Sequence, residues 1–151
     1  MIFNVNDITA KEVYTVSRDA TTLVNGTTVF TVIGGPIIIE EILAVCITAN
    51  NATASTLQYS ADGTDGAATT ISGASASLAS ATAGTIVATV PGTLATAPAV
   101  YANGVGIAGT VGIIVPKGII TITVGVGSTT GTWALQMRYR PVISGAFAVA
   151  S

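Results

Sequence analysis

The chain has 151 residues, of which half are hydrophobic and only 8% are charged, with a formal net charge of −2. Soluble domains usually contain about one quarter charged residues and display much of that charge on their surface. The length predicts one domain. Two explanations of the low charge compete: a membrane protein, or a subunit whose surface is covered by copies of itself or by partners.

No apolar run is long enough for a membrane-spanning helix, because Gly, Pro, Thr or Glu interrupts each one. Such a helix needs about 20 mostly apolar residues. A membrane β-barrel stays open as an alternative, but one Trp, four Tyr and three Phe are few for its aromatic girdles. We therefore favour assembly and expect no membrane partner. The first residues also lack the basic and apolar regions of a secretory signal, so we expect synthesis in the cytoplasm of the producing cell.

The residue types that carry most catalysis and metal binding are scarce. The chain has no His and one Cys, which removes the commonest general base and rules out a thiolate cluster. Asp62 and Asp65 lie in a Gly-rich turn without the further oxygen ligands of a calcium loop. Cys46 falls in an apolar run, where we interpret it as a small buried hydrophobe. We expect no enzyme activity, no cofactor and no metal site.

The few charges are unevenly placed. Residues 1–65 hold all seven acids and two bases, a net charge of −5, whereas residues 66–151 hold three bases and no acid, a net charge of +3. Nucleic-acid binding needs a concentrated basic face, so we expect no nucleic-acid partner. Either the two halves make a dipolar subunit that docks against neighbours, or the sparse charges have no such meaning.

Residues 1–20 carry five of the twelve charges and no persistent alternation. We interpret them as an N-terminal arm or edge strand, and residues 21–151 as a single β-sandwich domain. Asn25-Gly26 lies between β-branched runs and predicts a hairpin whose second strand ends at Ile33.

A long strand is predicted from Ile37 to Thr48. Adjacent Glu40 and Glu41 point to opposite sides of a regular strand, so without a bulge they cannot form a paired acid/base site. We expect one of them in solvent and the other in an interface or at a bulge. With Glu41 as an exception, one face of this strand is apolar and consists of Ile37, Ile39, Leu43, Val45 and Ile47.

The middle of the chain is rich in small residues. Residues 55–60 alternate, with Leu57 and Tyr59 inward. Residues 67–99 combine Ala, Ser, Thr and Gly with few of the strong helix formers, which predicts thin strands, partly buried between subunits, and not helices. The GxGxxG letters at residues 104–109 are rejected as a dinucleotide fingerprint, because a strand pattern and no acidic residue follow them.

The last quarter contains the clearest pattern. Residues 118–126 and 132–140 alternate strictly and are joined by a turn-rich stretch, which predicts an antiparallel pair at the centre of an all-β domain. We expect Ile122, Trp133, Leu135 and Met137 in the core. The apolar tail after Pro141 is expected to pair with a sheet or to pack against another subunit. The fold class is therefore an antiparallel β-sandwich with negligible helix.

Three segments resemble the small auxiliary head proteins of tailed bacteriophages, known as decoration or cement proteins. They are GGPIII at Gly34–Ile39, ASTLQYSADGT at Ala54–Thr64 and GTWALQMRYRPV at Gly131–Val142, in a charge-poor chain of this length. The resemblance implies a jelly-roll-like subunit, trimeric, that binds the outside of a capsid and clamps neighbouring major capsid proteins.

The sequence thus predicts a structural virion protein on the capsid surface, whose partners are the major capsid protein and itself as a homotrimer. Other virion parts, such as a tail or neck subunit or a receptor-binding fibre module, stay open as alternatives. The N-terminal charges differ in composition from the rest of the chain, so they are candidate capsid contacts, or else they only solvate an edge strand. These four residues are Lys11, Glu12, Arg18 and Asp19.

Overall fold

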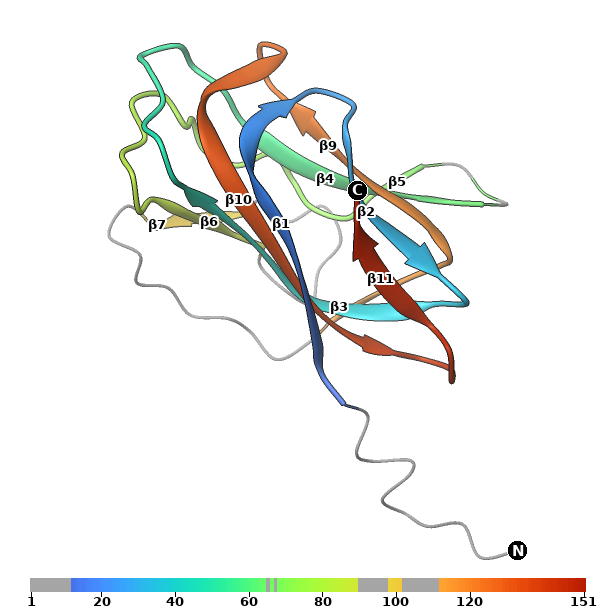
Figure 1. The fold of residues 1–151 in the computed structure, drawn as a ribbon. Helices are drawn as coiled ribbons and strands as arrows, with labels where there is room; N and C mark the ends of the chain where they lie inside the picture. Colours follow the sequence, from blue (N-terminus) through green and yellow to red (C-terminus); the bar gives the residue numbers. More distant parts are fainter. Residues whose placement is uncertain (1–11, 65, 67, 90–97, 102–111) are drawn as a thin grey trace, which may run out of the picture.

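The computed structural model describes residues 12–64, 66, 68–89, 98–101 and 112–151. Its described residues form two antiparallel sheets packed face to face and no helix (Figure 1). Strands that alternate apolar and polar residues can bury one face each, and two such sheets bury those faces against each other. This confirms the predicted all-β antiparallel sandwich.

Within the described residues, sheet A has six strands and sheet B has five. Sheet A has the order β1-β10-β3-β6-β7, with β8 also paired to β3, and sheet B has the order β11-β2-β9-β4-β5. The strands of sheet A are β1 (Tyr14–Val24), β3 (Ile37–Cys46), β6 (Ile86–Ala88), β7 (Ala99–Tyr101), β8 (Ile113–Val115) and β10 (Ser128–Pro141). Those of sheet B are β2 (Thr28–Ile33), β4 (Leu57–Gly63), β5 (Thr69–Thr70), β9 (Gly118–Val124) and β11 (Phe147–Ala150).

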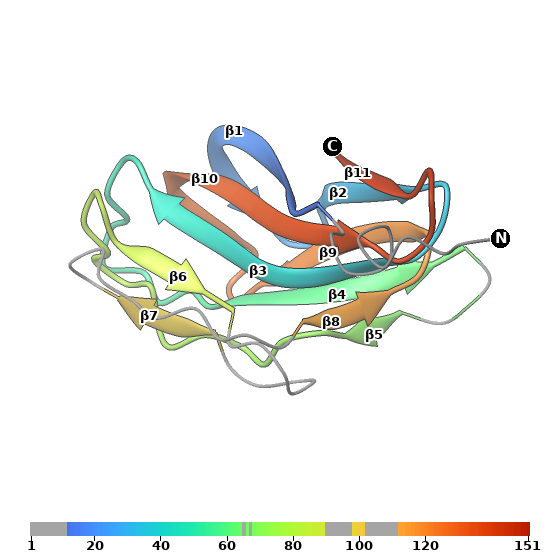
Figure 2. The ribbon, with the colours of Figure 1, turned by 90° about the horizontal axis from the view of Figure 1, so that it is seen from below.

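The chain crosses repeatedly from one sheet to the other. The orders β1-β10-β3-β6 and β2-β9-β4-β5 are those of a jelly roll, to which β11 adds an edge strand beside β2. Figure 2 shows β1 and β11 along one side of the sandwich and β5, β7 and β8 along the other. The expected jelly-roll-like fold is thus present, and the apolar tail pairs with a sheet as predicted, through β11 and β2.

Both predicted hairpins are wrong. β1 and β2 lie in different sheets, and so do β9 and β10. The turns at Asn25-Gly26 and at residues 125–127 instead carry the chain across the sandwich, and they bond to each other. Asn25 N donates to Gly127 O (2.8 Å), and Asn25 Oδ1 accepts from Val124 N (3.1 Å). The turn residues were recognised correctly, but the buried faces that the strands needed to cover decided their partners.

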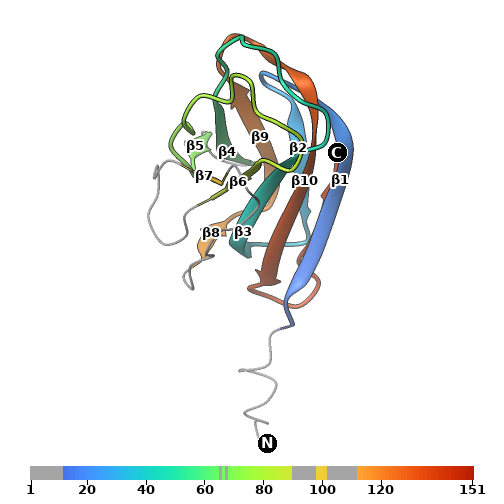
Figure 3. The ribbon, with the colours of Figure 1, turned by 90° about the vertical axis from the view of Figure 1, so that its left-hand side faces the viewer.

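The predicted core is confirmed at the last strands. Ile122, Trp133, Leu135 and Met137 are each at most 1% exposed. They face residues of β2, β3 and β4 in one cluster that also includes Phe30, Tyr59 and Ile42. β10 is the central element of this core, because it pairs with β1 on one side and with β3 on the other (Figure 3).

A β-bulge in β3 changes which residues face the core. Arg138 of β10 is opposite Glu41, and the next residue of β10, Tyr139, is opposite Ile39, so Glu40 is the extra residue. The core face therefore switches from Ile37 and Ile39 to the even-numbered residues Ile42, Ala44 and Cys46. The single apolar face predicted for this strand is wrong beyond the bulge: Leu43, Val45 and Ile47 lie on the outer face.

The serine-rich middle protects an edge of sheet B. Beyond the two residues of β5, the chain continues beside β4 and uses hydroxyl groups in place of regular pairing. Ser72 Oγ accepts from Tyr59 N (2.9 Å), and Ser75 Oγ accepts from Leu57 N (3.0 Å). This irregular ladder satisfies the buried backbone of β4 and leaves no regular edge there for another strand to extend.

Candidate interaction surface

The outer face of sheet A carries apolar side chains where a solvated sheet face would carry polar ones. The register places Val45 beside Ala134 and Ile86, and Ile38 beside Ile114. Ile114 is 66% exposed, and the others are partly exposed. The apolar patch, as it is called below, consists of Ile38, Leu43, Val45, Ile86, Ile114 and Ala134.

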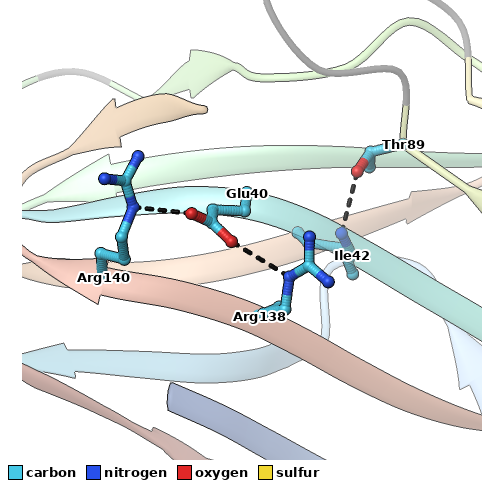
Figure 4. Close-up of polar contacts among 5 residues, drawn as sticks. All are labelled: Glu40, Ile42, Thr89, Arg138 and Arg140. Carbon is cyan, nitrogen blue, oxygen red and sulfur yellow. Dashed lines mark hydrogen bonds and ion pairs between the residues drawn. The ribbon is translucent and has the colours of Figure 1, made fainter. Parts of the chain in front are cut away.

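A three-residue ion cluster divides the apolar patch, because Glu40 lies between Ile38 and Leu43 along β3 and Arg140 is paired with Ile38 (Figure 4). Glu40 Oε2 accepts from Arg138 Nε at 3.0 Å, and Arg140 Nε lies 2.6 Å from Glu40 Oε1, an ion-pair distance without hydrogen-bond alignment. The Glu40 side chain is 17% exposed and the two arginines are 44% and 34% exposed. The bulge explains the cluster, because it inserts Glu40 between the two arginines of the neighbouring strand. The expectation of one glutamate at a bulge is confirmed.

The bulge also exposes a backbone group that needs another partner. Ile42 N donates to Thr89 Oγ1 (2.9 Å), and Thr89 N donates back to Ile42 O (3.0 Å) (Figure 4). These two hydrogen bonds satisfy the edge of β3 in the gap between β6 and β8, which both pair with β3 on this side. The patch is consequently held on a hydrogen-bonded scaffold and not on a loop.

The outer face of sheet B is different. On its central strands β4 and β9, most side chains that alternate with the core residues are hydroxyls and an amide, and Asp62 lies beside Ile119 at one end of the pair. The hydroxyls and the amide belong to Gln58, Ser60, Thr121 and Thr123. Such groups bond water without carrying charge. The edge strand β11 adds the exposed side chains of Phe147 and Val149 to this face. The central strands of the two sheets differ, and this difference makes the apolar patch on sheet A the candidate interaction surface.

The structure places the four N-terminal candidates differently. Lys11 lies outside the described residues. Glu12 is exposed and accepts a hydrogen bond from Tyr14 OH (2.8 Å), which raises the pKa of that phenol. Arg18 is half-buried, and its Nε donates to the backbone O of Ser151 (2.8 Å). Asp19 is exposed. Arg18 and Asp19 belong to β1, an edge strand of sheet A in which the proposed boundary at residue 20 falls.

Other candidates take structural roles or lie outside the described residues. Cys46 is 1% exposed, and burial raises the pKa of its thiol, so the interpretation as a buried hydrophobe is confirmed. Asp65 and the glycines at 104–109 are outside the described part of the chain. Within that part, no three potential ligands gather at a metal site, and no helix is long and apolar enough to cross a membrane.

Sequence reasoning missed the apolar patch. The alternation predicts Leu43 and Val45 inside and Ile86 in a thin strand. It does not reveal the one-residue bulge, which reverses every side chain beyond it. The signal was present in β3, whose two faces are both apolar. A strand with two apolar faces needs cover on both sides.

Comparisons with known proteins add little. No protein-family model matches the sequence, and no curated protein matches it. A solved structure described as "Structure of infectious bursal disease virus Gx strain" is similar with a TM-score of 0.32 and 14% sequence identity. The match covers 91% of this chain and 38% of that one, so the chain spans well under half the length of its structural match. At this TM-score the similarity carries no argument about function.

Proposed function

We propose that this protein is a structural component of a virion that binds the outside of a tailed-phage capsid as a closed oligomer, with three copies as the expected number, and stabilises the shell. The apolar patch on sheet A carries the proposal. A sheet face with partly exposed Leu43, Val45 and Ile86 is stable in water only at the cost of hydrated apolar area. Covering it with the major capsid protein removes that cost.

The physical logic of such a protein is mass action. A subunit that binds the assembled lattice and not the separated capsid proteins stabilises the lattice in proportion to the logarithm of its free concentration. This role needs no catalytic group, and we propose that the chain has no enzyme activity. The jelly roll is also a fold that viral capsid domains use, which is support by analogy only.

The ion cluster places charged side chains inside the proposed interface, between its two apolar parts. Interface centres are depleted of charge, whereas their rims are polar. Glu40 neutralises much of the charge of Arg138 and Arg140 before any partner arrives, so burying the cluster's edge costs less than burying a lone arginine. Glu12 and Asp19, which are exposed on the β1 side, are proposed as additional rim contacts together with Lys11.

The patch is tested by placing a charge in its middle. Val45→Lys keeps the long strand intact, because the lysine can extend into solvent in the free protein. The matched control is Thr123→Lys, which adds the same charge to the outer face of sheet B. We expect Val45→Lys to weaken binding to undecorated capsids by at least about tenfold, a loss typical of a central contact, and the control to bind as the parent does.

Circular dichroism and thermal melting of both variants show whether the sandwich is preserved. Equal capsid affinity for the two variants would overturn the assignment of the patch. Labelling of purified particles with an antibody against the chain separates the head from the tail. Labelling of the tail alone would contradict capsid decoration and would favour the alternative role as a tail, neck or fibre subunit.

A further inference from the structure

The two sides of the sandwich are closed to different extents. On the side of β1 and β11, polar side chains connect the sheets. Tyr139 of sheet A has its hydroxyl 3.0 Å from Ala148 N of sheet B, which donates to it. Arg18 Nε donates to Ser151 O, and the ring of Tyr14 stacks on Tyr139 with centroids 5.9 Å apart. This side has no need of a further strand.

The opposite side, where Figure 2 shows β5 and β8, contains a hollow of about 700 Å³ between β8 of sheet A and the β4–β5 edge of sheet B. Core residues form its apolar lining: Ala61 is 6% exposed, Ile71 5% and Val115 1%. Ile114 and Pro116 extend this lining to the surface, and Lys117 is the charged residue among the described residues that line it. The hollow has the size and character of a site for several apolar side chains.

The hollow is bordered by a strand that can accept another. β8 pairs with β3 through one edge, and no hydrogen bond joins its other edge to any part of the chain that the structure describes. A strand added there would place alternate side chains into the hollow, in the manner of β-augmentation. The serine ladder along β4 prevents the same addition on the sheet B side.

The N-terminal residues, which lie outside the described residues, match this site in chemistry. The first ten are MIFNVNDITA, with neither glycine nor proline. Phe3, Val5 and Asp7 fall on one face of an extended strand. In a parallel register with β8, Val5 is opposite Val115 and Asp7 is opposite Lys117, so the apolar residues meet the hollow and the carboxylate meets its cation.

We propose that residues 1–10 of a neighbouring copy add a strand to β8 and fill this hollow, so that the chains of the closed oligomer are connected by exchanged arms. The inference rests on the proposed assembly into oligomers and not on capsid binding. Burial between subunits would also explain why this side of the molecule carries little charge.

The direction of β1 favours a neighbour over the chain's own arm. Tyr14, Tyr139, Ile39 and Ile113 are successive partners in one row across sheet A. The own arm would therefore have to cross four strand spacings, about 19 Å, at right angles to the strands to reach the free edge of β8. With residues 3–7 opposite residues 113–117, only residues 8–13 would be left for this crossing and for the turn onto β8. The arm of a neighbouring copy does not have to cross the sheet, so all ten of its residues are free to lie along β8.

Disulfide crosslinking between two different variants tests the proposal. Both carry Cys46→Ala to remove the native thiol. One carries Asn4→Cys and the other carries Ile114→Cys. The proposed register places these two positions opposite each other on the exposed outer face of the sheet. The two proteins are mixed, allowed to exchange subunits, oxidised and separated by non-reducing electrophoresis. We expect a heterodimer band, whereas the control pair of Asn4→Cys with Thr123→Cys should give at least tenfold less.

Further variants determine which chain supplies the N-terminal arm and in which register the arm pairs with β8. A single chain with both Asn4→Cys and Ile114→Cys that crosslinks only within monomers would overturn the exchange in favour of the own arm. Absence of any crosslink at position 114, in protein that sediments as an oligomer, would overturn the site itself. Asp7→Lys should reduce the crosslink yield severalfold, and combination with Lys117→Asp should restore it. Failure of these tests with capsid binding intact leaves the proposed function standing.

Discussion

Asn50 is the buried polar residue on which one end of the sandwich depends. It is 7% exposed. Its Oδ1 accepts from Gly131 N (2.7 Å) and Trp133 Nε1 (3.3 Å), and its Nδ2 donates to Leu78 O (3.0 Å). Asn50→Ala leaves three groups without a partner, each costing about 1–3 kcal/mol. Because the indole bond is long and such costs are not additive, we expect a loss of about 3–5 kcal/mol in the free energy of unfolding.

Urea unfolding followed by circular dichroism measures this loss, and Trp133 fluorescence reports on the same site. The neighbour Asn51 provides the matched control: it is exposed, and its Oδ1 accepts only from Thr53 N (2.8 Å). Asn51→Ala should cost less than about 1 kcal/mol. Asn50→Asp keeps both acceptor contacts but faces Leu78 O with a carboxylate, so its stability should improve as the pH falls. A loss below about 1 kcal/mol for Asn50→Ala, or one equal to that of the control, would refute the reasoning.

Three further substitutions test other parts of the fold. The Tyr59 hydroxyl is buried without a hydrogen-bond partner and burial raises its pKa above the usual value of 10, so Tyr59→Phe should add about 1 kcal/mol of stability. The wild type has its full stability below pH 10 and should lose it above that pH, as the unfolded tyrosine ionises and the buried one resists; Tyr59→Phe should lose less, and equal alkaline midpoints would exclude the buried phenol as the cause. Val126 has a φ of 60°, so Val126→Gly should be neutral or stabilising by about 0.5 kcal/mol in thermal melts, whereas Val24→Gly in β1 should destabilise. Ser72→Ala removes the acceptor of Tyr59 N and should cost about 1–3 kcal/mol in urea unfolding; a neutral result would mean that the backbone finds another partner.

The positions of most strands followed from the sequence, but their partners did not. Alternation at residues 118–126 and 132–140 reports which side chains face a core, and both segments are strands with the expected residues buried. Alternation does not report which strand lies alongside. The turn at 125–127 can join neighbours in one sheet or cross between two sheets. The hydrogen bonds between this turn and Asn25, nearly one hundred residues away in sequence, hold the turn in the crossing arrangement. No local sequence pattern encodes this contact.

The bulge at Glu40 limited the prediction of the surface in the same way. Two adjacent glutamates indicated an irregularity, but not the reversal of faces beyond it. That reversal follows from the pairing of Tyr139 with Ile39 and of Arg138 with Glu41, which is a tertiary fact. The sequence pattern therefore points to the N-terminal charges as the candidate site, whereas in the structure Arg18 has a partner within the chain.

The structure also refines the argument from low charge. Charge is scarce on both outer faces, yet the two faces have different needs. Thr121, Thr123 and Ser60 solvate sheet B with neutral hydroxyl groups, which require no partner chain. The apolar patch around Val45 and most of the hollow beside β8, whose lining also includes Thr64 and Thr69, present apolar side chains instead, and these surfaces need cover. It follows that charging the patch should leave the isolated protein at least as soluble, while the same charge on sheet B should change neither solubility nor binding. Low charge in a composition is thus evidence of assembly only where apolar side chains, and not hydroxyls, take the place of the missing charges.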